Sequence, residues 1–182
     1  MCFMAGKIKR INRELAYRGK ILEVYSDQML IGETISQWDF IHLRGGAAVV
    51  PVLNDGKILM IKQYRNAIDE YSLEIPAGMY DSDEEAGETC AKRELLEETG
   101  YLAKEIRWLV SVHSLVAFTD EKVDVYLAET LTKGECNLDD EEEIETVAFT
   151  VEELKEKLRA GEITDAKTVA GLYAYISQKA DI

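Results

Sequence analysis

Proline and cysteine are scarce in this sequence of 182 residues, which contains two prolines and three cysteines. The cysteines are widely spaced and form no Cys-x-x-Cys pair, a pattern that excludes both a disulfide framework and a thiolate zinc site. No apolar run approaches the roughly eighteen residues that a membrane-spanning helix requires, and Met1–Arg10 contains no apolar stretch long enough for a secretory signal. These absences predict a cytoplasmic protein without a membrane partner.

Basic residues are also under-represented, with 21 Lys and Arg against 35 Asp and Glu and a net charge of −14. A surface of this sign repels nucleic-acid phosphates and anionic lipid, so no nucleic-acid partner is predicted. A small anionic ligand can still bind where a metal ion and a few arginines reverse the local field.

What the chain does contain is 47% hydrophobic residues, enough for a globular core at this length. Strand patterns at 20–25 and 28–31, separated by Ser26-Asp27, predict a small antiparallel arm. Residues 46–53 and 57–63 read as a hairpin around Asn54-Asp-Gly56. We expect two parts, an N-terminal β arm over residues 1–45 and a main domain over 46–182.

The rest of the pattern mixes strands with helices. Further strands are expected at 106–112, 122–128 and 145–149, and Pro76 should end the strand before it. A helix is expected over about 83–99, with Ser82-x-x-Glu85 as a capping box and Gly100 as its left-handed stop. Two helices follow, the first from Thr150 to Gly161 and the second capped at Thr164-Asp165, with Val169, Leu172, Tyr173 and Ile176 at helical spacing. The fold class is α/β of the α+β type, a mixed β-sheet between helices.

Three glutamates share one face of the helix expected over 83–99. Glu94, Glu97 and Glu98 fall within an arc of about 100° at helical spacing, which brings like charges together. Gly87 costs roughly 1 kcal/mol inside a helix and clears space beside them. A hard divalent cation such as Mg²⁺ suits such a pocket. The plainer alternative is a solvated charged helix, and the nearby Pro76-Ala-Gly78 turn and Gly100 favour the cation.

This segment resembles the Nudix box, which is a glycine, a glutamate, and then Arg-Glu-apolar-x-Glu-Glu-x-Gly-apolar. The matching residues are Gly78, Glu85 and the run Arg93-Glu94-Leu-Leu-Glu97-Glu98-Thr-Gly100-Tyr101. Gly78 and Glu85 are separated by six residues where the family has five. We therefore place a one-residue insertion in the loop ahead of the helix.

The resemblance implies a Nudix fold, a Mg²⁺-dependent hydrolase with Mn²⁺ as a substitute metal, and a role for each matching residue. Glu94 and Glu98 would be the principal metal ligands. The backbone carbonyl of Ala77, with Glu85 and Glu97, would complete the metal sites. Glu97 and Arg93 are also predicted to act in catalysis, Arg93 by pairing with the glutamates and holding them.

Flanking residues resemble the ADP-ribose pyrophosphatase branch of the family. These are Gln63-Tyr-Arg65, Leu73-Glu-Ile-Pro-Ala-Gly78 and the segment 161–168. By this resemblance Arg65 would contact the phosphates, Glu74 would bind ribose or diphosphate, and Glu142 or Glu143 would be the general base. The implied reaction is hydrolysis of ADP-ribose to AMP and ribose 5-phosphate. In relatives the arm pairs two subunits, so we expect a homodimer.

One departure from the branch leaves the substrate open. The branch carries a Ser-Pro-Gly-Phe loop beyond the box, and this chain reads Leu115-Val-Ala-Phe118 there. GDP-mannose, another nucleoside diphosphate sugar and a dinucleotide are therefore alternative substrates, and a non-catalytic nucleotide sensor is the alternative from another class. The adenine base needs an aromatic surface. Its candidate suppliers are Tyr17, Trp38, Phe40 and Phe118.

Overall fold

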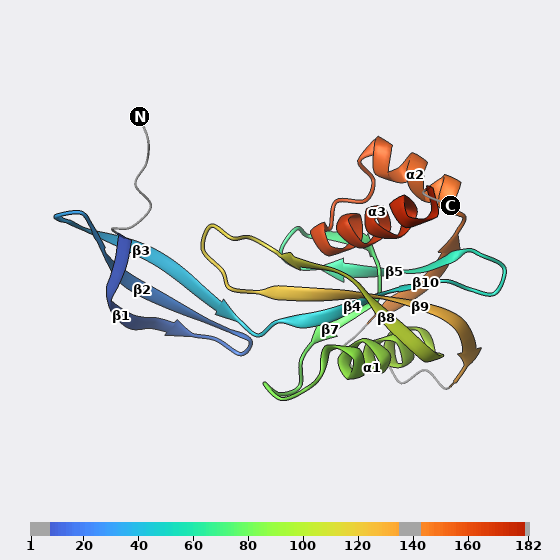
Figure 1. Cartoon of the computed structure of the whole chain (residues 1–182), viewed down its shortest axis with the longest axis horizontal. Coiled ribbons are helices and arrows are strands. Elements are labelled where there is room, and N and C mark those ends of the chain that lie inside the picture. Colours follow the sequence, from blue (N-terminus) through green and yellow to red (C-terminus); the bar gives the residue numbers. More distant parts are fainter. Residues whose placement is uncertain (1–7, 135–142, 181–182) are drawn as a thin grey trace. The chain divides into compact units, whose positions relative to one another are not determined.

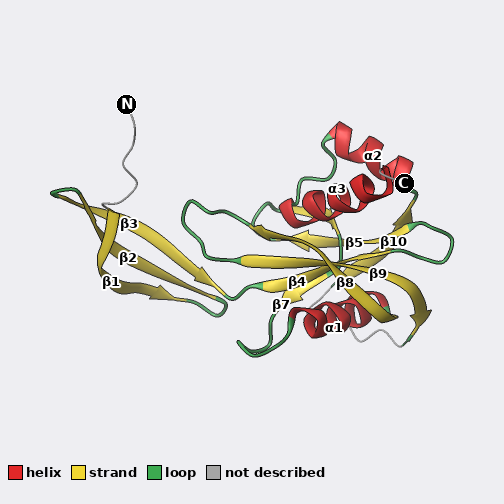
Figure 2. Ribbon diagram, viewed as in Figure 1, coloured by secondary structure: helices red, strands yellow, loops and turns green. Residues whose placement is uncertain are grey.

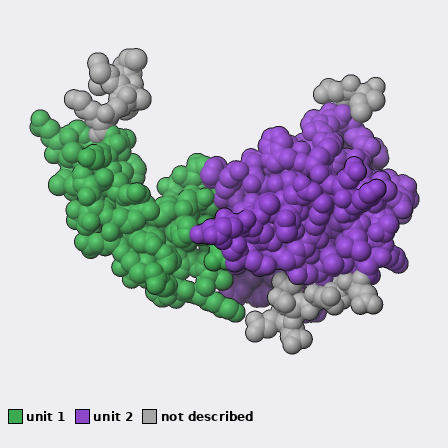
Figure 3. Space-filling view, turned by 60° about the horizontal axis from the view of Figure 1, so that its bottom comes forward, with its two compact units in different colours: residues 1–44, 115–121 green, residues 45–114, 122–182 purple. Residues whose placement is uncertain are grey.

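The computed structural model describes residues 8–134 and 143–180, which form ten strands and three helices (Figures 1 and 2). The described chain divides into two compact units, coloured separately in Figure 3. Unit 1 is Met1–Arg44 with Leu115–Glu121, and unit 2 is Gly45–Ser114 with Lys122–Ile182. The segment 115–121, which the sequence pattern assigns to the main domain, thus clusters with the arm. Among the described residues, no helix combines the length and apolar character needed to cross a membrane.

Unit 1 is built on a three-stranded antiparallel sheet in the order β1-β2-β3. The strands are β1 (Ile8–Arg18), β2 (Leu22–Ile31) and β3 (Thr34–Leu43). The expected break at Ser26-Asp27 is wrong, because β2 runs through it without interruption. The Asp27 carboxylate is buried and accepts two hydrogen bonds of 2.6 Å from Arg13 on β1, so it bonds across the sheet and forms no turn.

Unit 2 contains two sheets. The first, in the order β7-β4-β9-β8, joins β7 (Ala77–Met79), β4 (Gly46–Pro51), β9 (Lys122–Lys133) and β8 (Tyr101–His113). Its β4–β9 pair is parallel and its other pairs are antiparallel, so the predicted mixed sheet is confirmed. The second sheet, in the order β10-β5-β6, joins β10 (Ile144–Phe149), β5 (Ile58–Arg65) and β6 (Glu70–Glu74).

The expected hairpin forms only at its turn. Gly56 has a φ of +84° and its N–H donates to the Leu53 carbonyl at 2.8 Å, as a tight turn requires. Beyond one isolated bridge between Val52 and Ile58, however, β4 and β5 separate into different sheets. Instead, β4 pairs with β7 and β9, and β5 pairs with β6 and β10.

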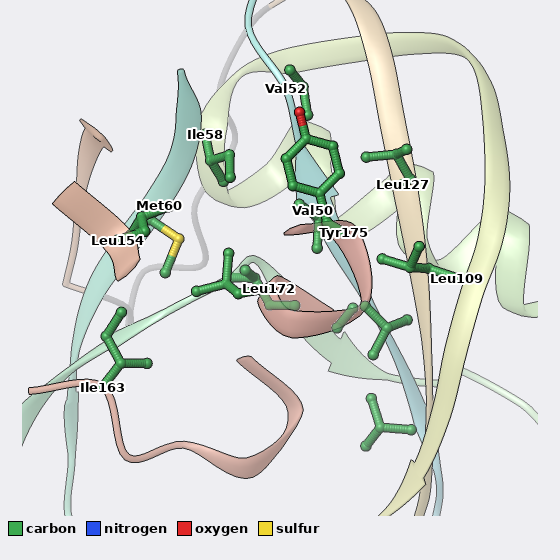
Figure 4. Packing of buried hydrophobic residues seen from close by; sticks show 14 residues of the cluster. Val50, Val52, Ile58, Met60, Leu109, Leu127, Leu154, Ile163, Leu172 and Tyr175 are labelled. Carbon is green, nitrogen blue, oxygen red and sulfur yellow. The ribbon is translucent and has the colours of Figure 1, made fainter. Parts of the chain in front are cut away.

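The helices cover both faces of the four-stranded sheet (Figure 1). Helix α1 (Gly87–Thr99) packs on one face, over Ala47 and Val49. Helix α3 (Ala166–Ala180) packs on the other face, and α2 (Val151–Ala160) adds Leu154 to the core on that side. Figure 4 shows Leu172 of α3 in this core, which also contains Val50 and Met60. Successive side chains of β4 point to opposite faces of the sheet, and helices cover both faces, so this central strand is buried throughout.

The helix ends agree only in part with the sequence pattern. Gly100 and Gly161 end their helices in the left-handed conformation, and the Thr150 capping box is present, as predicted. The capping box at Ser82 is wrong, because α1 begins at Gly87 after an Ala86 cap that makes no side-chain bond. In α3, Tyr173 is exposed and Tyr175 is buried, so that part of the expected core face is also wrong.

Candidate functional site

The acidic face of α1 separates into two buried carboxylates and one exposed carboxylate. Glu94 and Glu98 are 8% and 3% exposed, whereas the Glu97 side chain is 41% exposed. The i,i+4 spacing places the two buried groups on the same side of the helix, one turn apart. Buried carboxylates are uncommon unless they have specific partners, so this pair is not part of a solvated surface.

The turn after Pro76 lies against these two glutamates. The Ala77 N–H donates to Glu98 Oε2 at 3.0 Å, and β7 pairs with β4 through Ala77 and Gly78. A Cβ added to Gly78 would lie 1.9 Å from Glu94 Oε1, so a larger residue here would require that carboxylate to move. The turn that carries Ala77, a predicted metal ligand, therefore contacts both buried glutamates.

Gly87 has a different use from the one expected. A Cβ at this position would lie 2.4 Å from the Tyr126 hydroxyl, so the space that Gly87 leaves is filled by Tyr126 and not by the acidic groups. The glycine that makes room for a box carboxylate is Gly78.

Arg93 lies at the centre of the acidic cluster and bridges its members. Its Nη1 donates to Glu94 at 2.6 Å and to Glu97 at 3.1 Å, and its Nε donates to Glu85 at 3.2 Å. Its Nη2 donates to the Met79 carbonyl at 2.9 Å, which ties the helix to the strand β7. Burial lowers the pKa of Arg93, but the glutamates raise it more, so its pKa lies above the ordinary value. The predicted pairing of Arg93 with the glutamates is confirmed by these contacts.

The donors in this cluster suit a hard divalent cation. Glu94, Glu98 and the Ala77 carbonyl supply oxygen, the ligand that Mg²⁺ prefers. Within residues 8–134 and 143–180, no group of three or more His, Cys, Asp or Glu side chains is arranged around one ion position. Mg²⁺ is commonly held by one or two carboxylates while it keeps several waters, so two carboxylates and a carbonyl fit it.

A second charged group joins β5, β6 and α3. Arg65 donates from Nε and Nη2 to the Glu74 carboxylate at 2.8 and 2.6 Å, and Lys167 Nζ donates to Glu74 Oε2 at 2.5 Å. Glu74 is 2% exposed. Burial raises its pKa, but the hydrogen bonds and charges of Arg65 and Lys167 lower it more, so the pKa of Glu74 falls to about 2. The backbone links this group to the acidic face of α1, because Glu74 is three residues before Ala77, whose N–H donates to Glu98.

Three residues of this group are missed by the sequence reasoning. Lys167 contacts Glu74, Asp165 accepts from Lys167 Nζ at 3.0 Å, and the hydroxyl of the buried Thr168 accepts from the Ile75 N–H at 3.0 Å. Asp165 also accepts from the Thr168 N–H at 3.0 Å and so caps α3, as predicted. For the contacts of Lys167 with Glu74 and of Thr168 with Ile75, the resemblance of segment 161–168 to the branch was the only signal in the sequence.

The remaining candidates are the two predicted general bases and the four predicted aromatic residues. Glu143 is exposed, and its carboxylate accepts a long hydrogen bond of 3.4 Å from the Tyr71 hydroxyl. Glu142 lies outside the described residues. The four aromatic candidates all belong to unit 1, where Phe40 stacks on the Arg13 guanidinium at 3.7 Å. A pocket of about 400 Å³ in unit 2 involves none of the predicted residues. It is lined by Lys104, Glu105, Ile106, Arg107, Leu127, Glu129 and Thr130.

Comparison with known proteins gives a family match and several relatives. The NUDIX domain family matches residues 42–172. An ADP-ribose pyrophosphatase of Bacillus subtilis (strain 168) is 36% identical over 163 residues, which are 88% of each chain. A methanol dehydrogenase activator of Bacillus methanolicus is 33% identical over 165 residues, also 88% of each chain. A GDP-mannose pyrophosphatase of Salmonella typhimurium is 30% identical over 149 residues, covering 76% of this chain and 77% of the relative.

The fold is shared with a solved protein. The crystal structure of an ADP compounds hydrolase matches with a TM-score of 0.85 at 19% identity, over 97% of this chain and 96% of that one. Identity this low shows the fold alone. The family match, in contrast, spans more than half of the chain and includes the turn and helix that bring Gly78, Glu94 and Glu98 together. The chain therefore belongs to the NUDIX family and is a Nudix hydrolase.

Proposed function

We propose that the chain hydrolyses the diphosphate bridge of ADP-ribose, releasing AMP and ribose 5-phosphate. The observation that carries this proposal is the pair of buried carboxylates, Glu94 and Glu98, against the turn at Ala77 and Gly78. A buried acidic pair beside an anionic substrate requires a cation between them. The similarity to an ADP-ribose pyrophosphatase supports the choice of substrate.

Hydrolases of this family generally use divalent metal ions, and we propose Mg²⁺, with Mn²⁺ as a substitute. Glu94, Glu98 and the Ala77 carbonyl would hold the ion, with Glu85 and Glu97 near it. A bound ion supplies the charge that neutralises the diphosphate and makes water a better nucleophile.

The remaining charged groups bind and orient in this proposal. Arg93 holds Glu85, Glu94 and Glu97 at fixed distances, which limits the repulsion within the cluster. Arg65 keeps 38% of its side chain exposed while it is bound to Glu74, so its outer edge can donate to a phosphate. Glu74 fixes Arg65 and is the proposed contact for ribose or diphosphate. Glu142 and Glu143 are the proposed general bases.

A substrate panel tests the proposed reaction. The whole chain is incubated with Mg²⁺ and ADP-ribose, GDP-mannose, other nucleoside diphosphate sugars and dinucleotides, and the products are identified by mass spectrometry in ¹⁸O-labelled water. We expect the highest kcat/KM for ADP-ribose, with the label in a phosphate of one product. A higher kcat/KM for GDP-mannose would replace ADP-ribose in the proposal. Tight binding of a nucleotide without cleavage of any compound would instead support a sensor.

We also propose that unit 1 joins two copies of the chain into a homodimer. The sheet exposes apolar side chains on both faces, because the register β1-β2-β3 puts Ile8 and Ile35 on opposite sides. Their exposed fractions are 60% and 61%. Apolar surface of this kind on a small sheet favours association with a partner.

The double variant Ile8→Asp/Ile35→Asp is expected to sediment as a monomer where the wild type sediments as a dimer. The two substitutions place a charge on each face of the sheet, so whichever face forms the apolar interface would bury a charge, which is unfavourable. Ile68→Asp is the control, because Ile68 is 53% exposed in unit 2. A double variant that stays dimeric, or a wild type that is monomeric in the micromolar range, contradicts the proposed interface.

A further inference from the structure

The segment Glu74–Ala77, which joins β6 to β7, is held by side chains of two helices. The Ile75 N–H donates to the Thr168 hydroxyl of α3, and the Ala77 N–H donates to Glu98 of α1, both at 3.0 Å. Pro76 has no N–H, and its carbonyl accepts from the Val49 N–H at 2.9 Å. The backbone that carries Glu74 and Ala77 is therefore positioned by contacts that are far apart in the sequence.

The first turn of α3 contacts this segment through two successive residues. Lys167 Nζ donates to the Glu74 carboxylate, and Thr168 Oγ1 accepts from Ile75. Asp165 accepts from the Lys167 ammonium and from the Thr168 N–H, so it holds both residues at the start of the helix. Thr168 is fully buried. If its hydroxyl is replaced by a group of the same size, no water can enter to accept the hydrogen bond in its place.

Gly171, one turn further along α3, allows the close approach that this contact requires. A Cβ at this position would lie 3.0 Å from Val125 Cγ1 and 3.2 Å from Ile75 Cδ1. These distances are tight for a side-chain carbon. Glycine is less favourable than alanine inside a helix, but here it lets α3 lie near enough to the sheet for Thr168 to contact Ile75.

We propose that Thr168 is a positioning residue for the metal-binding turn, acting through Ile75 on the Ala77 carbonyl and on the bond from Ala77 to Glu98. This inference rests on the proposed function. A lost acceptor leaves the buried Ile75 N–H unpaired, and the segment must shift to find another partner. Ala77, two residues after Ile75, supplies both groups concerned. Its carbonyl is a proposed metal ligand, and its N–H donates to Glu98, a proposed carboxylate ligand. A displacement of about 1 Å at such a site lowers turnover by 10 to 100-fold in general.

The variant Thr168→Val tests this role, because valine has the shape of threonine without the hydroxyl. We expect Mn²⁺ alone to bind about tenfold more weakly, measured by the loss of its free electron paramagnetic resonance signal on titration, and kcat to fall about tenfold. Thr168→Ser keeps the acceptor and is expected to restore both values to within about threefold of the wild type. KM for ADP-ribose should change less than kcat, since Arg65 and Glu74 keep their mutual hydrogen bonds.

The matched control is Thr150→Val, which removes a side-chain hydrogen bond at the start of α2, away from the turn. It should lower the melting temperature without changing Mn²⁺ affinity or kcat. Equal effects of Thr168→Val and Thr150→Val on both quantities, or no recovery in Thr168→Ser, would overturn the inference. If Thr168→Val does not fold, Thr168→Ala removes the same hydroxyl with less risk of overpacking and is measured in its place.

The wild type separates this inference from the proposed function. A wild-type chain that neither binds Mn²⁺ nor cleaves a nucleotide refutes the proposed function and the positioning role with it. A wild type that does both, beside a Thr168→Val variant with unchanged Mn²⁺ affinity, refutes only the positioning role.

Discussion

Glu98→Gln and Glu94→Gln are each expected to lower kcat for ADP-ribose by about 1,000-fold or more at saturating Mg²⁺, equivalent to about 4 kcal/mol of transition-state stabilisation. Glutamine keeps the shape of the side chain but removes the charge that a divalent cation requires. Both carboxylates are buried, so bulk water cannot supply an equivalent ligand. Steady-state rates over a range of Mg²⁺ concentrations measure the loss, and the Mg²⁺ concentration at half-maximal rate should rise in both variants.

Glu88→Gln is the control for these two substitutions. Glu88 lies on the same helix, 54% of its side chain is exposed, and it forms an i,i+4 pair with Lys92 at 2.7 Å. An exposed pair of this kind contributes about 0.3–0.5 kcal/mol, so this variant should keep the wild-type kcat. Full activity in Glu94→Gln or Glu98→Gln would reject the metal-binding role of that residue, and full activity in both would reject the proposed mechanism.

The second large effect concerns stability and is expected at Glu74. Its pKa in the folded chain is about 2, below the ordinary value of 4.5, so its charged form stabilises the fold at pH values above about 4.5. This stabilisation is lost as the pH falls towards about 2. The lost contribution is roughly 2 kcal/mol by about pH 3 and roughly 3 kcal/mol by about pH 2.

Glu74→Gln isolates this contribution because glutamine does not titrate. Urea unfolding at several pH values gives the free energy of unfolding of both proteins. The wild type should be the more stable protein at about pH 6, and the difference should shrink by roughly 2 kcal/mol by about pH 3. A difference that stays constant over this range would mean that Glu74 keeps an ordinary pKa, and that Arg65 and Lys167 do not hold it as the geometry indicates.

The acidic cluster was predictable because its geometry is local. Glu94 and Glu98 share a face through the i,i+4 spacing of a helix, and Gly100 ends that helix through a backbone conformation that glycine adopts easily. The start of the same helix was not predictable. Ser82 and Glu85 have the spacing of a capping box, but the Glu85 carboxylate bonds to the Asp81 N–H and to Arg93, and these contacts replace the cap.

The turn at Gly56 was predicted correctly, but the pairing of the strands on either side of it was not. Gly56 makes a tight turn, yet β4 and β5 belong to different sheets. β4 pairs with β9 and β5 pairs with β10, strands that are each more than sixty residues away in the chain. Hydrogen-bond patterns along a strand do not identify its partner, since every strand offers the same backbone groups. The partner is chosen by burial of the side chains, which the local sequence does not specify.

The sequence by itself determined the family of this protein, the helix that carries its acidic residues and the glycines that end two of its helices. Each of these depends on residues within a few positions of one another, where backbone geometry leaves few alternatives. Only the tertiary structure decided which residues surround Glu74 and Ile75, because Lys167 and Thr168 are each 93 positions from their partners. Such contacts depend on how α3 packs against the sheet, and that packing is a property of the whole core.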